Sequence, residues 1–164
     1  MGAFTYPRSE PGSAGHQDLV ERLNAHAATL RHEVANLSEP LLTQRVGDDW
    51  SIKDVVGHLC DWSHLVHKRL HMMINLEDPR LAGLDQEELA KVRNANATPI
   101  GDLLKEYAAQ RAETVDMLAD LVHWNWARPG RHPHAGRISI RQQVEMWLDH
   151  EDEHFAQIRA LKSE

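Results

Sequence analysis

The stretch SIRQQVEMWLDHEDEHFAQI, residues 139–158, carries the pattern that decides the fold. Ser139 and Gln142 form a capping box, in which each side chain bonds the backbone N–H of the other residue at the start of a helix. Apolar side chains then return at helical intervals, which places them on one face. This apolar face consists of Ile140, Val144, Trp147, Phe155 and Ile158. The stretch therefore predicts a helix that has one buried face and ends near Lys162.

Two histidines of this helix, His150 and His154, are one turn apart and project from the same side. At about 100° per residue, His150 lies at the edge of the apolar face and His154 lies within it. Glu151 also points inward, which is unusual for a carboxylate. The spacing H-E-x-x-H allows both imidazoles to reach one divalent metal ion.

Apolar repeats and capping signals predict three more long helices, at about residues 16–37, 51–75 and 98–122. Ser51 with Asp54 resembles a second capping box, and Thr98-Pro99 supplies a capping residue and a proline for the first turn. Together with the C-terminal helix they predict an all-α protein, a four-helix bundle.

The segments between and before these helices have different characters. Residues 1–15 contain several prolines and glycines and are expected to form a flexible N-terminal tail, so that the domain covers residues 16–164. Residues 85–96 are polar and suggest a short helix, and residues 123–138 are expected to form a loop. No segment alternates between apolar and polar residues as a strand does.

Composition limits the classes of partner. The chain has 164 residues and a net charge of -7, which argues against nucleic acid, because nucleic-acid binding favours a basic face. No apolar run reaches the roughly 20 residues of a membrane span, and the N-terminus lacks the apolar core of a signal peptide. We therefore expect a cytoplasmic protein whose partners are a small-molecule substrate and a second copy of the chain, as a homodimer.

A third inward histidine, His58, lies within the apolar arc of the helix at residues 51–75. The other histidines of that helix are expected on its solvent side: His64, His67 and His71. Cys60, the only cysteine, points about 200° away from His58.

The inward set His58, His150 and His154 has two interpretations. Three neutral imidazoles can hold one metal ion and leave positions open for water or substrate, as in catalytic zinc sites. Alternatively, each is a buried histidine satisfied by hydrogen bonds. A zinc peptidase, with Glu151 as general base, is disfavoured because no histidine follows His154 to act as the third ligand.

Two blocks of the sequence resemble the DinB/YfiT-like superfamily of metalloenzymes. The first is WSIKDVVGHL, residues 50–59. The second begins with the His-Pro…Gly loop of residues 132–136, continues through the capping box and ends in HEDEHFAQI, residues 150–158. Relatives often carry Asp where this chain has Glu151. The similarity covers nearly the whole chain from about residue 16.

The resemblance implies a bundle with up-down-down-up helix order and a divalent metal held by His58, His150 and His154. Zinc and nickel both suit imidazole ligands. It also implies a metal-dependent transferase that uses a low-molecular-weight thiol such as mycothiol or bacillithiol, or a hydrolase. The alternative is a non-catalytic bundle that binds a metal or small ligand. Glu151 is expected to act as a base or to orient a ligand histidine.

The segment WNWARPGRHPH, residues 124–134, is the next richest in functional side chains. Arg128 and Arg131 are candidates for a rim that binds an anionic substrate. His132 and His134 are weaker candidates for additional metal ligands. The alternative is a helix connection whose tryptophans cover the core.

Overall fold

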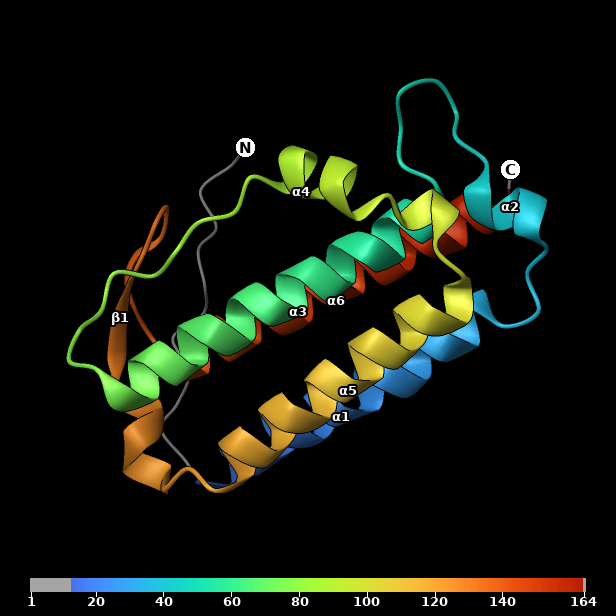
Figure 1. The fold of residues 1–164 in the computed structure, drawn as a ribbon. Coiled ribbons are helices and arrows are strands. Elements are labelled where there is room, and N and C mark those ends of the chain that lie inside the picture. Colours follow the sequence, from blue (N-terminus) through green and yellow to red (C-terminus); the bar gives the residue numbers. More distant parts are fainter. Residues whose placement is uncertain (1–12, 164) are drawn as a thin grey trace.

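The computed structural model describes residues 13–163 (Figure 1). The elements, in chain order, are α1 (Ser13–Val34), α2 (Glu39–Thr43), α3 (Ile52–Asn75), α4 (Gln86–Arg93), the 3-10 helix η1 (Ala95–Ala97), α5 (Ile100–Ala119), the 3-10 helix η2 (His123–Ala127), β1 (Pro129–His132), β2 (Gly136–Ser139) and α6 (Ile140–Lys162).

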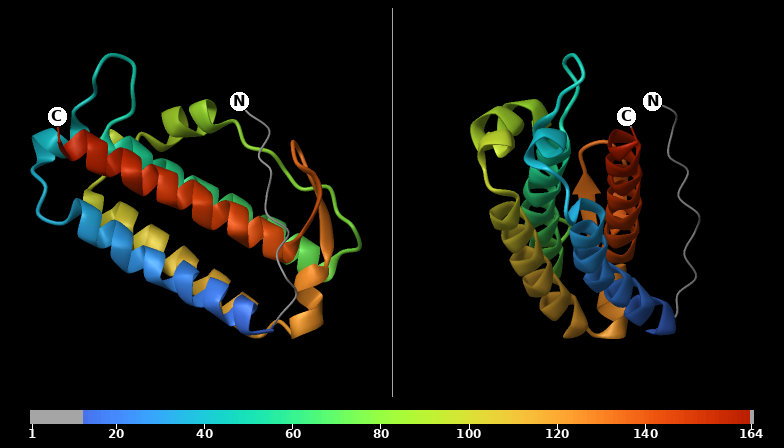
Figure 2. Two further views of the ribbon diagram at one scale, coloured as in Figure 1. Left: turned by 180° about the vertical axis from the view of Figure 1, so that it is seen from behind. Right: turned by 90° about the vertical axis from the view of Figure 1, so that its right-hand side faces the viewer.

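The four long helices α1, α3, α5 and α6 form a four-helix bundle, as the sequence predicted. Each long helix packs against two others: α1 and α3 both contact α5 and α6. Figures 1 and 2 show that α1 and α6 run in one direction and that α3 and α5 run in the other. This is the expected up-down-down-up order, in which the consecutive long helices α3 and α5 are parallel and need a long connection. That connection contains α4 and η1.

Capping boxes set the starts of the two helices that carry the candidate histidines. In α3 the Ser51 hydroxyl accepts from the backbone N–H of Asp54, and the Asp54 carboxylate accepts from the N–H of Ser51. In α6 Ser139 and Gln142 make the same reciprocal pair. Both boxes predicted from the sequence are therefore present, and they satisfy backbone N–H groups that have no partner inside the helix.

The apolar core is divided into two clusters along the bundle axis. One cluster lies towards the hairpin end and includes Leu23 of α1, Val66 of α3 and Leu148 of α6. The other lies towards the opposite end and includes Leu30 of α1 and Phe155 of α6. Between these levels each long helix places polar side chains in the interior, and this layer contains the candidate site.

Several local expectations were wrong. The segment expected to be a loop forms an antiparallel hairpin of β1 and β2, in which Gly130 pairs with Ile138. Gly136 has a φ of 75°, in the left-handed region, which a residue with a side chain adopts at a cost. Gly130 packs so closely that a Cβ there would lie 2.9 Å from Met73. These strands are short, and their burial comes from tertiary contacts. Their sequence therefore shows too little alternation of apolar and polar residues to predict a strand.

The boundaries of the first helix also differ from the expected ones. Residues 13–15, expected in the tail, form the start of α1, and residues 1–12 lie outside the described part of the chain. The helix ends at Val34 rather than Leu37. Ser38 then caps the short helix α2, which tolerates Pro40 in its first turn. Thr98 does not cap α5, because its hydroxyl bonds the carbonyl of Asn94 instead.

The long segment between α3 and α4 returns along the bundle and is fastened to the hairpin. The N–H of Leu81 donates to the carbonyl of Arg131, and the N–H of Arg131 donates to the carbonyl of Pro79. Among the helices in residues 13–163, none combines the length and apolar character needed to cross a membrane.

Replacing Ser139 with Ala should destabilise the fold by about 1 kcal/mol, because the N–H of Gln142 loses its acceptor at the start of α6. Chemical denaturation followed by circular dichroism measures this difference. Ser163→Ala is the matched control, since Ser163 is exposed at the other end of α6, and its effect should be within about 0.5 kcal/mol. Equal effects of the two substitutions would contradict the capping role.

Candidate metal centre

The side chains of His58, His150 and His154 converge between α3 and α6. Nε2 of His150 lies 3.2 Å from Nε2 of His58 and 3.1 Å from Nε2 of His154. The three rings offer ligand atoms that all lie within 4.8 Å of one another. Within residues 13–163, no other group of three or more His, Cys, Asp or Glu side chains gathers in this way. The antiparallel packing of α3 against α6 thus brings together residues 92 positions apart.

The ring of His154 is oriented by a residue one turn further along α6. Nδ1 of His154 lies 2.8 Å from the side-chain oxygen of Gln157. An amide oxygen can only accept a hydrogen bond, so Nδ1 carries the proton and Nε2 presents its lone pair to the other two rings. Gln157 therefore fixes the tautomer that a metal ligand needs.

Two tryptophans of α3 and its cap flank the histidines. The indole of Trp62 stacks on His150, with ring centres 4.5 Å apart and an angle of 26°. The indole of Trp50 lies 4.9 Å from the ring of His58. These indoles limit the access of water to the rings and restrict their rotation.

Burial keeps the imidazoles of His58 and His150 neutral near pH 7. Burial, with smaller contributions from His154 and His150, lowers the pKa of His58 from 6.5 to about 3. Burial and His154 lower the pKa of His150 to about 4, against the opposing effect of Glu151. Because the neutral ring is the form that binds a metal ion, these environments prepare both side chains for ligation at neutral pH.

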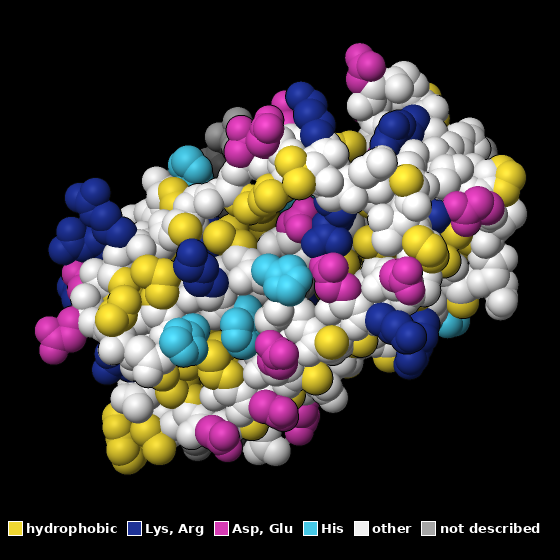
Figure 3. All heavy atoms as spheres, in the orientation of Figure 1, with side chains coloured by type: hydrophobic (Ala, Val, Ile, Leu, Met, Phe, Trp, Pro, Cys, Tyr) yellow, Lys and Arg dark blue, Asp and Glu magenta, His cyan; other side chains and the backbone are white. Residues whose placement is uncertain are grey.

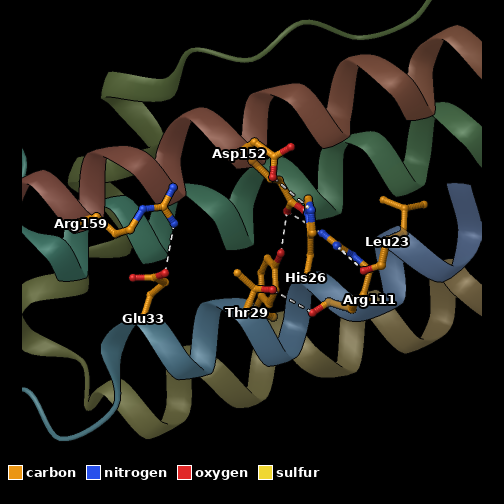
Figure 4. A network of polar contacts seen from close by, with 10 residues as sticks. Leu23, His26, Thr29, Glu33, Arg111, Asp152 and Arg159 are labelled. Carbon is orange, nitrogen blue, oxygen red and sulfur yellow. Dashed lines mark hydrogen bonds and ion pairs between the residues drawn. The ribbon is translucent and has the colours of Figure 1, made fainter.

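Glu151 of α6 makes polar contacts with side chains of α1 and α5. Figure 4 shows two of these partners, His26 and Arg111, within the network between the helices. The side chain of Glu151 is 0% exposed. One oxygen is 2.8 Å from Nδ1 of His26 on α1. The other accepts from the Tyr107 hydroxyl at 2.8 Å and from Nη2 of Arg111 at 2.5 Å, both on α5. The inward direction expected for Glu151 is therefore what the structure shows.

These contacts engage both oxygens of Glu151 with α1 and α5. Glu151 makes no hydrogen bond to His150 or His154. Nδ1 of His150 is itself buried without a partner among the described residues. The structure thus places Glu151 where it holds helices together, and its action as a base or on a ligand ring stays a prediction.

The charge state of Glu151 follows from its partners. Burial alone would raise its pKa, but the charge of Arg111 and the hydrogen bonds from His26 and Arg111 outweigh burial and hold the pKa at about 2. Arg111 is 1% exposed and also donates to the carbonyl of Leu23 on α1. Its guanidinium carbon lies 4.3 Å from the centre of the Trp147 ring. The ion pair thus compensates both buried charges, and the Nε of Arg111 is the one guanidinium nitrogen without a hydrogen-bond partner among the described residues.

The structure does not bring Arg128 and Arg131 to the three histidines. Arg128 donates to the carbonyls of Met73 and Leu76 at the end of α3, and Arg131 pairs with Asp78. Met73 is 15 residues from His58, about 22 Å along a helix. Arg128 thus joins the start of the hairpin to the end of α3, and Arg131 joins it to the loop after α3.

The remaining histidines of the hairpin are also apart from the three-histidine cluster. Nδ1 of His132 accepts from the backbone N–H groups of His134 and Ala135, so it stabilises the turn between β1 and β2.

The face formed by α3 and α5 carries several histidines near acidic side chains (Figure 3). His64 and His71 are exposed, as expected. His67 is not a surface residue in the expected sense, because it is half-buried and its Nδ1 lies 2.8 Å from the Thr114 hydroxyl on α5. Cys60 is buried, its thiol donates to the carbonyl of Leu103, and burial raises its pKa.

Some residues of the site were not found from the sequence. Gln157 and Trp62 follow His154 and His58 by three and four residues, the spacing at which helical side chains are neighbours, so this signal was available. Tyr107, Arg111 and His26 gave no comparable signal, because their common partner Glu151 is 40 or more residues away in the sequence.

Comparison with known proteins establishes the family. Residues 22–158 match the model of the DinB superfamily, and the chain belongs to that superfamily. Two curated proteins of Oceanobacillus iheyensis, each named as a candidate metal-dependent hydrolase, are similar in sequence. One is 29% identical over 133 residues, covering 80% of this chain and 77% of the relative. The other is 25% identical over 148 residues, covering 89% and 84%.

The fold has a close match among solved structures. YfiT from Bacillus subtilis, described as a probable metal-dependent hydrolase with an unusual four-helix bundle topology, superposes with a TM-score of 0.88. The match covers 97% of this chain and 92% of YfiT, at 18% sequence identity. It confirms the four-helix bundle.

Replacing Glu151 with Gln should lower the free energy of unfolding at pH 7 by about 3–5 kcal/mol, because the charge of Arg111 is left buried without its counter-charge. The pKa of Glu151 is lowered from 4.5 to about 2, so its contribution is complete above about pH 4.5 and is lost as the pH falls towards 2. The difference in the free energy of unfolding between wild type and variant should therefore shrink as the pH falls from about 4.5 to 2. Urea unfolding at several pH values measures it.

Asp152→Asn is the matched control for this experiment. Asp152 contacts the same His26 from the next position of α6, but its side chain is 55% exposed. Its replacement should cost less than about 1 kcal/mol. The depressed pKa of Glu151 would be contradicted if the free energies of unfolding of wild type and Glu151→Gln differed by the same amount from pH 7 to pH 2.

Proposed function

We propose that His58, His150 and His154 bind one divalent metal ion and that the protein is a metal-dependent hydrolase of a small molecule. The observation that carries this proposal is the convergence of the three Nε2 atoms, with separations of 3.1 Å and 3.2 Å about His150. The names of the relatives from Oceanobacillus iheyensis and the description of YfiT support the same class of activity.

The donor set fits a metal ion such as zinc or nickel. Two nitrogens that each lie about 2.0–2.1 Å from one tetrahedral ion are about 3.4 Å apart, close to the observed separations. Nε2 of His154 presents a lone pair to the other two rings, because Gln157 holds the proton on Nδ1. Burial disfavours the positively charged form of His58 and His150, and a neutral imidazole can present a lone pair of Nε2 to a cation.

Three histidines leave room for another ligand in a tetrahedral site, the pattern of catalytic rather than structural zinc. A divalent ion supplies Lewis acidity there, which makes a water or a thiol nucleophilic near neutral pH. The chain's own part is to hold the imidazoles. Gln157 keeps the proton of His154 on Nδ1, and Trp62 and Trp50 hold the rings of His150 and His58.

Among residues 13–163, neither Cys60 nor Glu151 is placed to act as a nucleophile at this position. Cys60 is buried against α5, and Glu151 is engaged by Arg111, Tyr107 and His26. The attacking group would therefore be water, in a hydrolase, or the sulfur of an added thiol such as mycothiol or bacillithiol, in an S-transferase. The relatives' names favour water, and the family resemblance of the sequence blocks keeps the thiol as the second candidate.

Purified protein should bind one zinc or nickel ion per chain, and His58→Ala, His150→Ala and His154→Ala should each weaken binding by more than about 100-fold. Gln157→Leu should cost about 10–100-fold, because the orienting hydrogen bond is lost. His71→Ala, on an exposed part of α3, is the matched control and should bind as wild type does. Titration of metal-free protein by calorimetry, with elemental analysis of the isolated protein, measures stoichiometry and affinity. An unchanged metal affinity in His58→Ala would contradict the three-histidine site.

Metal-loaded protein should hydrolyse an activated ester or amide without any added thiol, and the rate should fall to background in His58→Ala. The same protein is then supplied with an electrophile and mycothiol, bacillithiol or glutathione, and conjugates are followed by mass spectrometry. Hydrolysis without thiol supports the hydrolase. Conjugation by one thiol, lost in His58→Ala and without hydrolysis, would replace the hydrolase by the S-transferase.

A further inference from the structure

Arg69 of α3 is a buried guanidinium that has no counter-charge among residues 13–163. It is 2% exposed, and no carboxylate of the described chain forms an ion pair with it. The other buried arginine, Arg111, is paired with Glu151. An isolated buried cation is costly, because burial removes its hydration and nothing replaces it.

The hydrogen bonds of Arg69 leave part of the guanidinium available. Nε donates to the carbonyl of Ala82 at 2.9 Å. Nη1 lies 3.4 Å from the side-chain oxygen of Gln143 on α6, longer than an ordinary N–H···O hydrogen bond. Nη2 makes no hydrogen bond within the part of the chain that the structure describes. The two Nη groups together form the fork that binds a carboxylate with two parallel bonds.

Arg69 lies on the same face of α3 as His58, one of the three clustered histidines. His58, Trp62 and Arg69 follow one another at intervals of four and seven residues on α3, so they share a face. The Trp62 ring stacks on His150 at 4.5 Å, and the guanidinium carbon of Arg69 lies 5.8 Å from the centre of the Trp62 ring. The guanidinium is thus separated from a candidate metal ligand by roughly the width of one indole.

The segment that accepts the hydrogen bond from Nε of Arg69 is weakly held. Residues 82–84 make no backbone–backbone hydrogen bond to the rest of the described chain, and the bond from Arg69 to Ala82 joins them to α3. Segments with few backbone hydrogen bonds open at low free-energy cost. Displacement of this segment would therefore free the Nε of Arg69 and leave the backbone hydrogen bonds of the long helices in place.

We propose that Arg69, assisted by Gln143, binds a carboxylate of the substrate, whose reacting bond lies over Trp62 towards the three histidines. The substrate class is a small organic acid with a hydrolysable bond about one ring's width from its carboxylate. This proposal rests on the proposed function for the identity of the reacting end, but the anion site itself does not require the metal. Arg69 is then a specificity residue, and Trp62 lies near both its guanidinium and the ring of His150.

A carboxylate fits this site better than a phosphate. The neighbouring side chains are Trp62, the amide of Gln143 and His132, and burial with Arg69 close by lowers the pKa of His132 to about 4. His132 is thus neutral near pH 7, and Arg69 supplies a single positive charge. One guanidinium balances a monoanion, whereas a phosphate monoester carries up to two negative charges near pH 7.

The test is a titration of metal-free protein with phenylacetate and with its uncharged analogue phenylacetamide. The readout is the ¹⁵N-resolved indole N–H signal of Trp62, assigned by its loss in Trp62→Phe. Phenylacetate should shift this signal in a saturable way, and phenylacetamide should not. In Arg69→Gln the affinity for phenylacetate should fall by about tenfold or more. Arg131→Gln, at the exposed Asp78 pair, is the matched control and should leave the affinity unchanged.

Equal titrations with phenylacetate and phenylacetamide in wild type would overturn the proposal, and this comparison stands even if Arg69→Gln does not fold. An unchanged affinity for phenylacetate in a folded Arg69→Gln variant would also overturn the proposal. Arg69 would then serve only to hold residues 82–84 against α3. Tighter saturation by phenyl phosphate would overturn the choice of a carboxylate. Saturable acid binding by a protein that fails to bind zinc would keep the Arg69 site while removing the metal centre, so the two proposals fail separately.

Discussion

The carboxylate of Glu151 is shielded from water and receives hydrogen bonds from side chains of two other helices. His26 of α1 and both Tyr107 and Arg111 of α5 meet it at the middle of the bundle. Apolar contacts above and below this level tolerate small rotations and shifts of a helix, because they are non-directional. The ion pair and its hydrogen bonds do not, since each bond needs a defined distance and angle. Glu151 therefore fixes the rotation of α6 within the bundle.

The position of the candidate metal centre depends on that rotation. His150 and His154 lie on the side of α6 next to α3 when Glu151 faces α5 and α1, and His58 then meets them from α3. The polar layer thus has two parts with different roles. The part towards α1 and α5 is closed, with its charges paired, and stabilises the fold. The part towards α3 presents three imidazoles whose Nε2 atoms face one another, and it is suited to binding a cation.

The proposed substrate contacts follow the same division of the bundle. The side of α3 and α6 that carries the three histidines also carries Trp62, Arg69 and Gln143. Two buried arginines therefore have opposite electrostatic situations. Arg111 is paired with Glu151 inside the bundle, whereas Arg69 has no ion-pair partner among the described residues. The paired polar groups position the helices, and the three histidines with Arg69 are the groups proposed to meet a ligand.

The sequence by itself determined the four long helices, because apolar periodicity and two capping boxes are local signals that tertiary contacts do not need to complete. It also identified the three histidines, since their direction relative to each apolar face follows from helix geometry alone. Tertiary structure decided what a helix face meets. The partners of Glu151, the hairpin in place of a loop, the bond of His67 to Thr114 and the distance of Arg128 and Arg131 from the histidines all depend on contacts between helices, or between a helix and the hairpin. The spacing of residues along a helix shows the direction in which a side chain points. Only the packed bundle shows which residue of another element lies in that direction and contacts it.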